Sequence, residues 1–345
     1  MTGPGVRMPA ETAPHLRCWM AWPARRGIWG GLLPHVRTEI AQLARVIAEF
    51  EPVVMLAAPR QVEQARRALG GGVAVVPMPV DDVWIRDTGP IFVHDAHGRV
   101  AGVDLAFNGW GGRQRHRRDR HVARRLLDRL GLPRASSRLV IEPGGFESDG
   151  DGTALATRSC LLHPARNRDA SPGEVERELA TLLGVREVVW LDGVPDLDVT
   201  DCHVDGLARF VQPGLVVVHQ PVPGSDPAWE RVTHQALEVL AGATDARGRR
   251  LRVVTLPEPT SVRVTDPALL AHFVAGYVNY YVANDAVVMP RFGDRASDDR
   301  AAGILGDLYP GRRVVAVDLD TLLSGGGGIH CVTRDQPRPA PPAPR

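Results

Sequence analysis

Residues 87–93 read DTGPIFV, a polar turn followed at once by the apolar, β-branched run of a buried strand. Four other stretches repeat this order: DGDGTALAT from Asp149, HVDGLARFV from His203, NYYVANDAVVMP from Asn279 and GGGGIHCVT from Gly325. Measured from Asp87, Asp149, Asp205, Asn279 and His330, the intervals are 62, 56, 74 and 51 residues. This spacing predicts about five supersecondary units in a ring. The polar turns that precede their strands, the lead-ins, would then gather at the central axis of the ring. A doubly wound sheet is the alternative.

Helical periodicity alternates with short Val-rich strands along the chain, which predicts an α/β fold. In residues 34–50, Ile40, Leu43, Ala44, Ile47 and Phe50 recur at helical spacing. Further helices are expected at 61–69, 121–130, 172–183, 227–240 and 298–308, and strands at 52–57 and 73–78.

The length of 345 residues and the hydrophobic content of 44% are enough to bury a large core. We expect one catalytic domain over residues 1–333, and a disordered or extended tail in the proline-rich residues 334–345. The net charge of +1 favours neither nucleic acid nor an anionic membrane as partner. Because neither a run of about 18 apolar residues nor a basic, apolar leader is present, we expect a cytoplasmic protein.

The chain has four cysteines, at 18, 160, 202 and 331, without C-x-x-C spacing, which argues against a disulfide framework or a structural zinc site. Cys18 and Cys160 lie in apolar stretches and are expected to be buried fillers. Every one of the 41 basic side chains is an arginine. Lysine-based chemistry, including a Schiff base and a P-loop lysine, is therefore excluded.

The segment TDCHVDG, residues 200–206, presents a histidine and an aspartate two residues apart. In an extended chain His203 and Asp205 would point to one face, which suits a proton-transfer group beside a charge-binding group. Cys202 would point to the other face, although a metal held by these three residues is an alternative. Ordinary structural roles for these polar residues are a further alternative.

The tract of four glycines at 325–328 costs conformational entropy in any helix or strand, so it indicates a close approach of the backbone or a positive φ. It delivers His330 and Cys331 to the start of a strand, which makes Cys331 a candidate nucleophile. A flexible linker before the tail is the plain alternative.

Two other loops carry candidate acids. Trp84 and Asp87 precede a Thr-Gly-Pro turn, where a rigid element could hold a carboxylate that binds a cation; a turn cap and a core tryptophan are the alternative. Glu142 ends an apolar run, before a loop that lacks the full calcium-binding pattern. The arginine-rich run 113–125 lacks interleaved aromatics, which favours a solvated helix face or a contact between subunits over nucleic-acid binding.

Seven segments together strongly resemble the agmatine deiminases, and with them the bacterial peptidylarginine deiminases of the pentein superfamily. The resemblance runs from about Met8 to Pro337. The segments are MPAETAPHLRCWMAWP, DDVWIRDTGPIFV, FNGWGG, EPGGFESDGDGT, TDCHVDGLARFV, GYVNYYVANDAVVMPRFGD and GGGGIHCVT.

This resemblance implies the pentein fold, a fivefold pseudosymmetric α/β propeller, and a role for each candidate. Cys331 resembles the nucleophile and His203 the general acid and base. Asp87 and Asp205 resemble the carboxylates that grip the guanidinium, Glu142 the acid that orients the histidine, and Trp84 and Gly327 parts of the substrate site. Two departures from the family pattern are Pro143, where Glu-Gly-Gly is usual, and Cys202, where glycine is usual.

The implied activity is hydrolysis of agmatine to N-carbamoylputrescine and ammonia through a covalent thiouronium on Cys331, a hydrolase reaction on a linear amidine without metal or organic cofactor. Another guanidine, a peptidyl-arginine or a non-catalytic guanidine-binding protein are the alternatives. The expected partner is a small guanidine, and a homo-oligomer is possible. We further expect that Asp87 and Asp205 raise the pKa of Cys331 in the free enzyme and that a bound cation lowers it.

Overall fold

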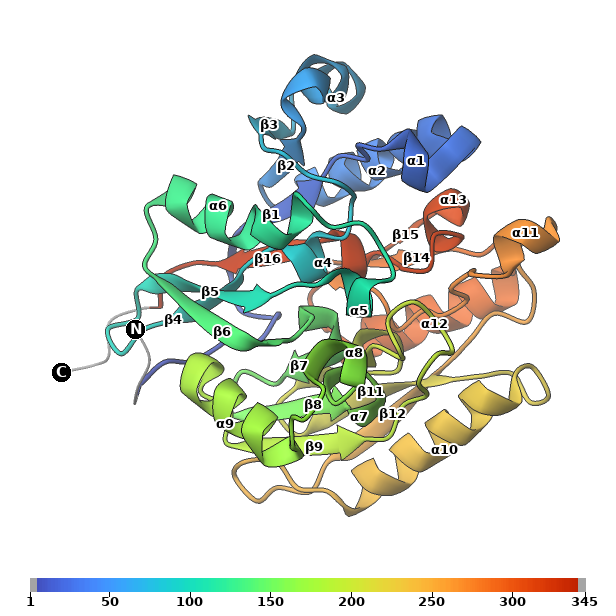
Figure 1. Ribbon diagram of the computed structural model, residues 1–345. Helices are drawn as coiled ribbons and strands as arrows, with labels where there is room; N and C mark the ends of the chain where they lie inside the picture. The colour runs from blue at the N-terminus through green and yellow to red at the C-terminus, as the bar shows by residue number, and fades with distance from the viewer. Residues whose placement is uncertain (1–4, 341–345) are drawn as a thin grey trace.

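The computed structural model describes residues 5–340, in which the strands form five small sheets arranged in a ring (Figure 1). Each sheet begins with an antiparallel strand pair and continues with a parallel one. A short turn can join antiparallel strands, whereas a parallel partner needs a crossover, which a helix supplies here. The arrangement confirms the predicted fivefold α/β propeller and excludes the doubly wound sheet.

Four of the sheets follow one another along the chain, each with three strands and one long helix. The first holds β4 (Ile91–His94), β5 (Val100–Ala106), α6 (Val122–Leu130) and β6 (Arg134–Val140). The second holds β7 (Phe146–Ser148), β8 (Thr153–Thr157), α9 (Pro172–Leu183) and β9 (Glu187–Leu191). The third holds β10 (Ala208–Gln212), β11 (Leu215–Gln220), α10 (Pro227–Gly242) and β12 (Arg252–Pro257). The fourth holds β13 (Tyr281–Val282), β14 (Ala286–Pro290), α12 (Arg295–Leu308) and β15 (Arg313–Val317).

The fifth sheet joins the two ends of the chain and closes the ring. Its order is β16-β1-β2-β3, with bounds β16 (Arg334–Pro337), β1 (His15–Ala21), β2 (Val53–Ala57) and β3 (Ala74–Pro77), and with the helices α2 (Leu33–Ala48) and α3 (Val62–Leu69). The prediction that the folded body ends near Thr333 was wrong. β16 is an edge strand, where proline is tolerated, and Trp19 Nε1 donates a 3.0 Å hydrogen bond to its buried Gln336. Residues 341–345 of the expected tail lie outside the described residues.

The predicted helices are confirmed, and so is the apolar face predicted for the helix in residues 34–50. Ile40, Leu43, Ala44 and Ile47 of α2 are fully buried, and Phe50 packs partly buried against the same core. The short helices are α1 (Arg26–Trp29), α4 (Ile85–Thr88), α5 (Gly109–Gly112), α7 (Arg158–Leu161), α8 (Pro164–Asn167), α11 (Pro267–Leu270) and α13 (Asp320–Leu323). Within residues 5–340, no helix combines the length and the apolar character needed to cross a bilayer.

Short helical segments precede the first strand of several sheets and meet at the axis. They are α4 before β4, and the 3₁₀ turns η4 (Pro143–Gly145) before β7, η5 (Val204–Gly206) before β10 and η6 (His330–Val332) before β16. The amide of Gly144 donates to Asp87 at 2.9 Å, and Arg86 Nε donates to the His330 carbonyl at 3.1 Å. These hydrogen bonds join segments from three different sheets.

Two details of the predicted lead-ins were wrong. Asp149 lies in the hairpin turn between β7 and β8, where its Oδ1 accepts from the amides of Asp151 and Thr153, and the segment at the axis is the one after Glu142. His203 and Asp205 do not share an extended strand, because His203 begins the turn η5. Side-chain capping of a tight turn explains the first error.

Removing β16 should therefore destabilise the whole ring. A chain truncated after Thr333 loses the four paired positions of β16, and at about 1 kcal/mol for each hydrogen bond we expect a loss of at least about 3 kcal/mol in the free energy of unfolding. Urea unfolding of the two chains measures this difference in the free energy of unfolding. A chain truncated after Ala340 is the control; equal unfolding midpoints for the two chains would contradict the role of β16.

Candidate active site

The thiol of Cys331 lies half-buried at the axis, beside an acid from another sheet. Its Sγ donates to Asp205 Oδ2 at 3.7 Å and to Asn279 Oδ1 at 3.5 Å. Burial, followed by the negative charges of Asp205 and Asp87, raises the pKa of Cys331 well above its ordinary value. The structure thus brings together a thiol and two carboxylates that lie more than 100 residues apart in sequence.

Asp87 is held in place by two donors. Its Oδ1 accepts from the amide of Gly144 at 2.9 Å, and its Oδ2 accepts from Trp110 Nε1 at 2.9 Å. His203 Nδ1 lies 3.7 Å from Oδ2. Burial raises the pKa of Asp87; the nearby His203 opposes this shift, and Asp205 adds to it.

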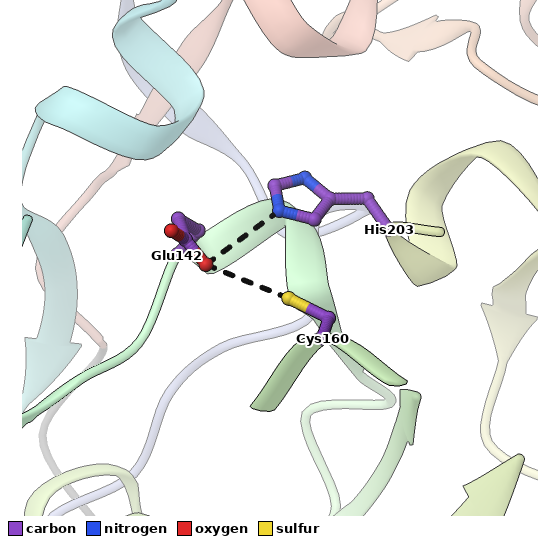
Figure 2. A group of neighbouring side chains, drawn as sticks. All are labelled: Glu142, Cys160 and His203. Atoms are coloured by element: carbon purple, nitrogen blue, oxygen red, sulfur yellow. Dashed lines mark hydrogen bonds and ion pairs between the residues drawn. The ribbon is translucent and has the colours of Figure 1, made fainter. Parts of the chain in front are cut away.

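On its other side, the ring of His203 faces Glu142 (Figure 2), the residue that the family resemblance gives as its orienting acid. His203 Nε2 lies 3.8 Å from Glu142 Oε2, which also accepts from Cys160 Sγ at 3.5 Å. Burial disfavours a charged His203, but the surrounding groups, Asp87 first, raise its pKa well above the ordinary value. Cys160 is fully buried, as predicted, and burial raises its pKa to about 11, so this thiol stays protonated near neutral pH.

Behind Glu142 lies an arginine that the sequence does not single out. Arg166 Nε donates to Glu142 Oε2 at 2.6 Å, and Arg166 Nη1 donates to Asp201 Oδ2 at 2.6 Å. Asp201 also binds Arg113. Arg113 is exposed, as expected for the run 113–125, but the expected helix face was wrong for residues 113–121, because α6 begins only at Val122.

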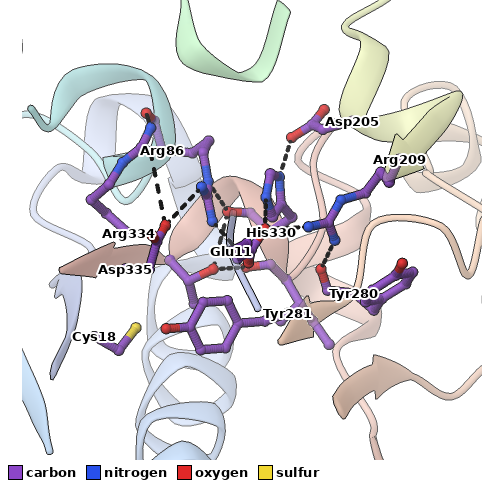
Figure 3. Close-up of polar contacts among 12 residues, drawn as sticks. Glu11, Cys18, Arg86, Asp205, Arg209, Tyr280, Tyr281, His330, Arg334 and Asp335 are labelled. Atoms are coloured by element: carbon purple, nitrogen blue, oxygen red, sulfur yellow. Dashed lines mark hydrogen bonds and ion pairs between the residues drawn. The ribbon is translucent and has the colours of Figure 1, made fainter. Parts of the chain in front are cut away.

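A second network holds Asp205 (Figure 3). His330 Nδ1 lies 2.8 Å from Asp205 Oδ2, and His330 Nε2 lies 2.9 Å from Glu11 Oε2. Glu11 also binds Arg209 and lies 3.5 Å from Arg86 Nη2. Burial opposes ionisation of Asp205, but the hydrogen bond and charge of His330 outweigh it and lower the pKa of Asp205 to about 2. The acid nearest the thiol is thus ionised.

The glycine tract packs against aromatic rings and a side-chain amide. A Cβ added at Gly327 would lie 2.5 Å from Trp84 Cζ3, one at Gly325 would lie 2.4 Å from Trp29 Cη2, and one at Gly328 would lie 2.5 Å from Asn279 Oδ1. The glycine tract is therefore explained by the close approach of its backbone to these side chains, and the alternative of a flexible linker is wrong. Trp84 is 7% exposed.

The two departures from the family pattern, Cys202 and Pro143, lie in turns of the backbone. Cys202 adopts a left-handed φ of 65°, which glycine adopts without strain, and its side chain is fully buried in an apolar cluster. Its carbonyl accepts from Thr157 Oγ1 at 2.7 Å, which braces the turn before His203. Pro143 is the first residue of η4, where a missing N–H costs no hydrogen bond.

Comparison with known proteins agrees with this architecture. The family model described as Porphyromonas-type peptidyl-arginine deiminase matches residues 7–337. The agmatine deiminase of Pseudomonas aeruginosa is 38% identical over 97% of this chain and 96% of its own length, and that of Medicago truncatula is 36% identical over 96% of each. A solved agmatine deiminase of Enterococcus faecalis superposes with a TM-score of 0.90 at 31% identity, over 97% of each chain. The chain belongs to the Porphyromonas-type peptidyl-arginine deiminase family.

Proposed function

We propose that this chain hydrolyses agmatine to N-carbamoylputrescine and ammonia, with Cys331 as the nucleophile. The observation that carries the proposal is the position of Cys331 Sγ, 3.7 Å from the carboxylate of Asp205, in a site that also holds Asp87 and His203. A planar cation that is held by two carboxylates, next to a thiol, is the arrangement that guanidinium chemistry requires.

In the proposed reaction, Asp87 and Asp205 bind the N–H groups of the guanidinium through charge-assisted hydrogen bonds. The Cys331 thiolate adds to the central carbon, and His203 protonates the departing nitrogen, which leaves as ammonia. The remaining thiouronium is covalently bound to Cys331. His203 then deprotonates a water that attacks this carbon, and the C–S bond breaks to release the ureido product. Glu142 orients His203 from the opposite side of its ring.

Trp84 and Gly327 form part of the proposed substrate site, since their close contact fixes the wall beside the glycine tract. The relatives named agmatine deiminase support agmatine as the substrate, and the family description leaves a peptidyl-arginine as the second candidate. A catalytic cysteine must stay reduced, and a reducing compartment preserves it best, so we place the reaction in the cytoplasm.

A Cys331→Ala variant should lose at least about 10⁴-fold in kcat, because a nucleophile that acts as one unit with its base has no substitute. Ammonia release from agmatine, arginine and an arginyl peptide measures activity and substrate preference together. Cys18→Ser, which changes a buried cysteine of β1, is the matched control. Turnover in the Cys331→Ala variant would refute the mechanism, and release only from the arginyl peptide would refute agmatine as the substrate.

The raised pKa of Cys331 predicts slow alkylation of the free enzyme at neutral pH. A bound guanidinium offsets the charges of Asp205 and Asp87, so a non-reactive analogue should shift the alkylation profile to lower pH. The measurement is the rate of Cys331 alkylation against pH, with and without the analogue, after subtraction of the rate in Cys331→Ala. A free-enzyme pKa near 6, about 2.5 units below the reference thiol, would exclude this substrate assistance.

His330 should act as a positioning residue through Asp205. A His330→Asn variant removes a hydrogen bond to a charged group, worth about 1.5–3 kcal/mol, so we expect kcat/KM to fall about 10- to 100-fold, mainly through KM. Without His330, burial raises the pKa of Asp205, and the acidic limb of the kcat/KM profile should move to higher pH.

The control for this variant is His219→Asn, because His219 is also a buried histidine that pairs with a carboxylate, Glu258, at 3.4 Å. Glu11→Gln keeps a hydrogen-bond acceptor for His330 and should have a smaller effect. An unchanged acidic limb in His330→Asn would show that His330 does not act on Asp205.

A further inference from the structure

Three side chains of different chemistry converge at the back of the candidate site: a carboxylate, a thiol and an imidazole (Figure 2). Glu142, Cys160 and His203 come from three separate segments, and one ligand atom of each lies within 4.8 Å of the other two. Glu142 and Cys160 are fully buried, and His203 is 5% exposed. Sulfur, nitrogen and oxygen donors of these kinds are the ligands that zinc takes in proteins.

The spacing of the three atoms suits a tetrahedral ion. Bond lengths of about 2.3 Å to sulfur and about 2.1 Å to nitrogen and oxygen imply edges of roughly 3.6 Å between S and O and roughly 3.4 Å between N and O. Cys160 Sγ lies 3.5 Å from Glu142 Oε2, and His203 Nε2 lies 3.8 Å from the same oxygen. Small rotations of the side chains would therefore complete the geometry.

Two buried atoms at this position have no hydrogen-bond partner among the described residues. They are His203 Nε2, which is directed at the cluster, and Glu142 Oε1. A buried polar atom without a partner is costly, so it indicates a place for a ligand. On the far side of the ring, His203 Nδ1 faces Asp87 at 3.7 Å, the placement of the outer carboxylate that orients a metal-binding histidine.

The nearby positive charge does not exclude a cation. Arg166 binds Glu142 only through Oε2, and it is shared with Asp201. Oε2, the oxygen whose distances match the tetrahedral edges, keeps a second lone pair beside this bond, and Oε1 has no partner among the described residues. Asp201 is in turn bound by Arg113, which also binds Asp196, so Asp201 and Asp196 together supply two negative charges for the two arginines without the charge of Glu142.

We propose that Glu142, Cys160 and His203 form an inhibitory binding site for a divalent cation of the zinc class. On binding, the Cys160 thiol and the protonated His203 ring, at Nε2, each release one proton to solvent, and a metal–sulfur bond and a metal–nitrogen bond form. The metal occupies His203 Nε2 and holds the remaining ring proton on Nδ1. His203 can then no longer exchange a proton with the reacting groups. The inhibition, but not the binding, rests on the function proposed above.

Binding is tested without catalysis in the full chain carrying Cys331→Ala, where the nucleophile cannot ligate the metal. We expect one equivalent of Zn²⁺ by calorimetry, and a near-ultraviolet sulfur-to-metal absorption with Co²⁺ as the spectroscopic probe. Adding Cys160→Ser should abolish the absorption and weaken Zn²⁺ binding at least about 10-fold. Loss of a residue that only hydrogen-bonds to a metal ligand already lowers metal affinity by about this factor, and loss of a ligand should cost no less. Cys18→Ser in the same background should retain both signals.

Glu142→Gln in the Cys331→Ala background is a second variant and should also weaken binding. In the enzyme with Cys331 intact, Zn²⁺ should inhibit reversibly on addition of a chelator, and Cys160→Ser should raise the half-inhibitory concentration at least about 10-fold. Absence of Zn²⁺ binding in Cys331→Ala, or an absorption that persists after Cys160→Ser, would overturn the site. Equal Zn²⁺ inhibition with and without Cys160 would overturn its inhibitory role.

Discussion

The hydrogen bond between His330 and Asp205, 2.8 Å long, holds an ionised carboxylate beside the thiol of Cys331. Burial alone would favour the neutral acid, and the thiol would then lose the anion that lies 3.7 Å from its sulfur. His330 is itself held by Glu11, from the N-terminal segment, and Glu11 is bound by Arg209. The network therefore requires both ends of the chain to meet. β16, which begins three residues after Cys331 and pairs with β1, brings them together.

The two carboxylates of the site are not equivalent. The pKa of Asp205 is lowered by His330, whereas that of Asp87 is raised by burial. Both acids act on Cys331 by raising its pKa. In the proposed reaction, a guanidinium bound between the two carboxylates would offset their charges and so lower the pKa of Cys331. The proposal thereby links substrate binding to activation of the nucleophile by electrostatics.

His203 is supported from behind by a chain of alternating charges. Glu142 binds Arg166, Arg166 binds Asp201, and Asp201 binds Arg113. These ion pairs hold the side chain of Asp201, in the turn before His203, and the next residue, Cys202, adopts a left-handed φ of 65°. Among residues 5–340, one oxygen of Glu142 and one nitrogen of His203 have no hydrogen-bond partner, and the protonated thiol of Cys160 belongs to the same cluster. The orienting acid and the proposed cation site therefore share the same atoms.

Local sequence determined the strands, the long helices and the residue types at the axis. Period-2 and helical patterns, turn residues and the glycine tract are properties of neighbouring residues, so Cys331, His203 and Asp87 could be selected without coordinates. The positions of Arg166, Glu11 and β16 were decided only by the tertiary structure. Glu11 and Arg209 are 198 residues apart, and nothing in their surroundings marks either as a partner. A buried charge is stable only beside an opposite charge, and the tertiary structure decides which residue supplies it. In the same way, the closing strand Arg334–Pro337 is stable only because β1 lies beside it and pairs with it.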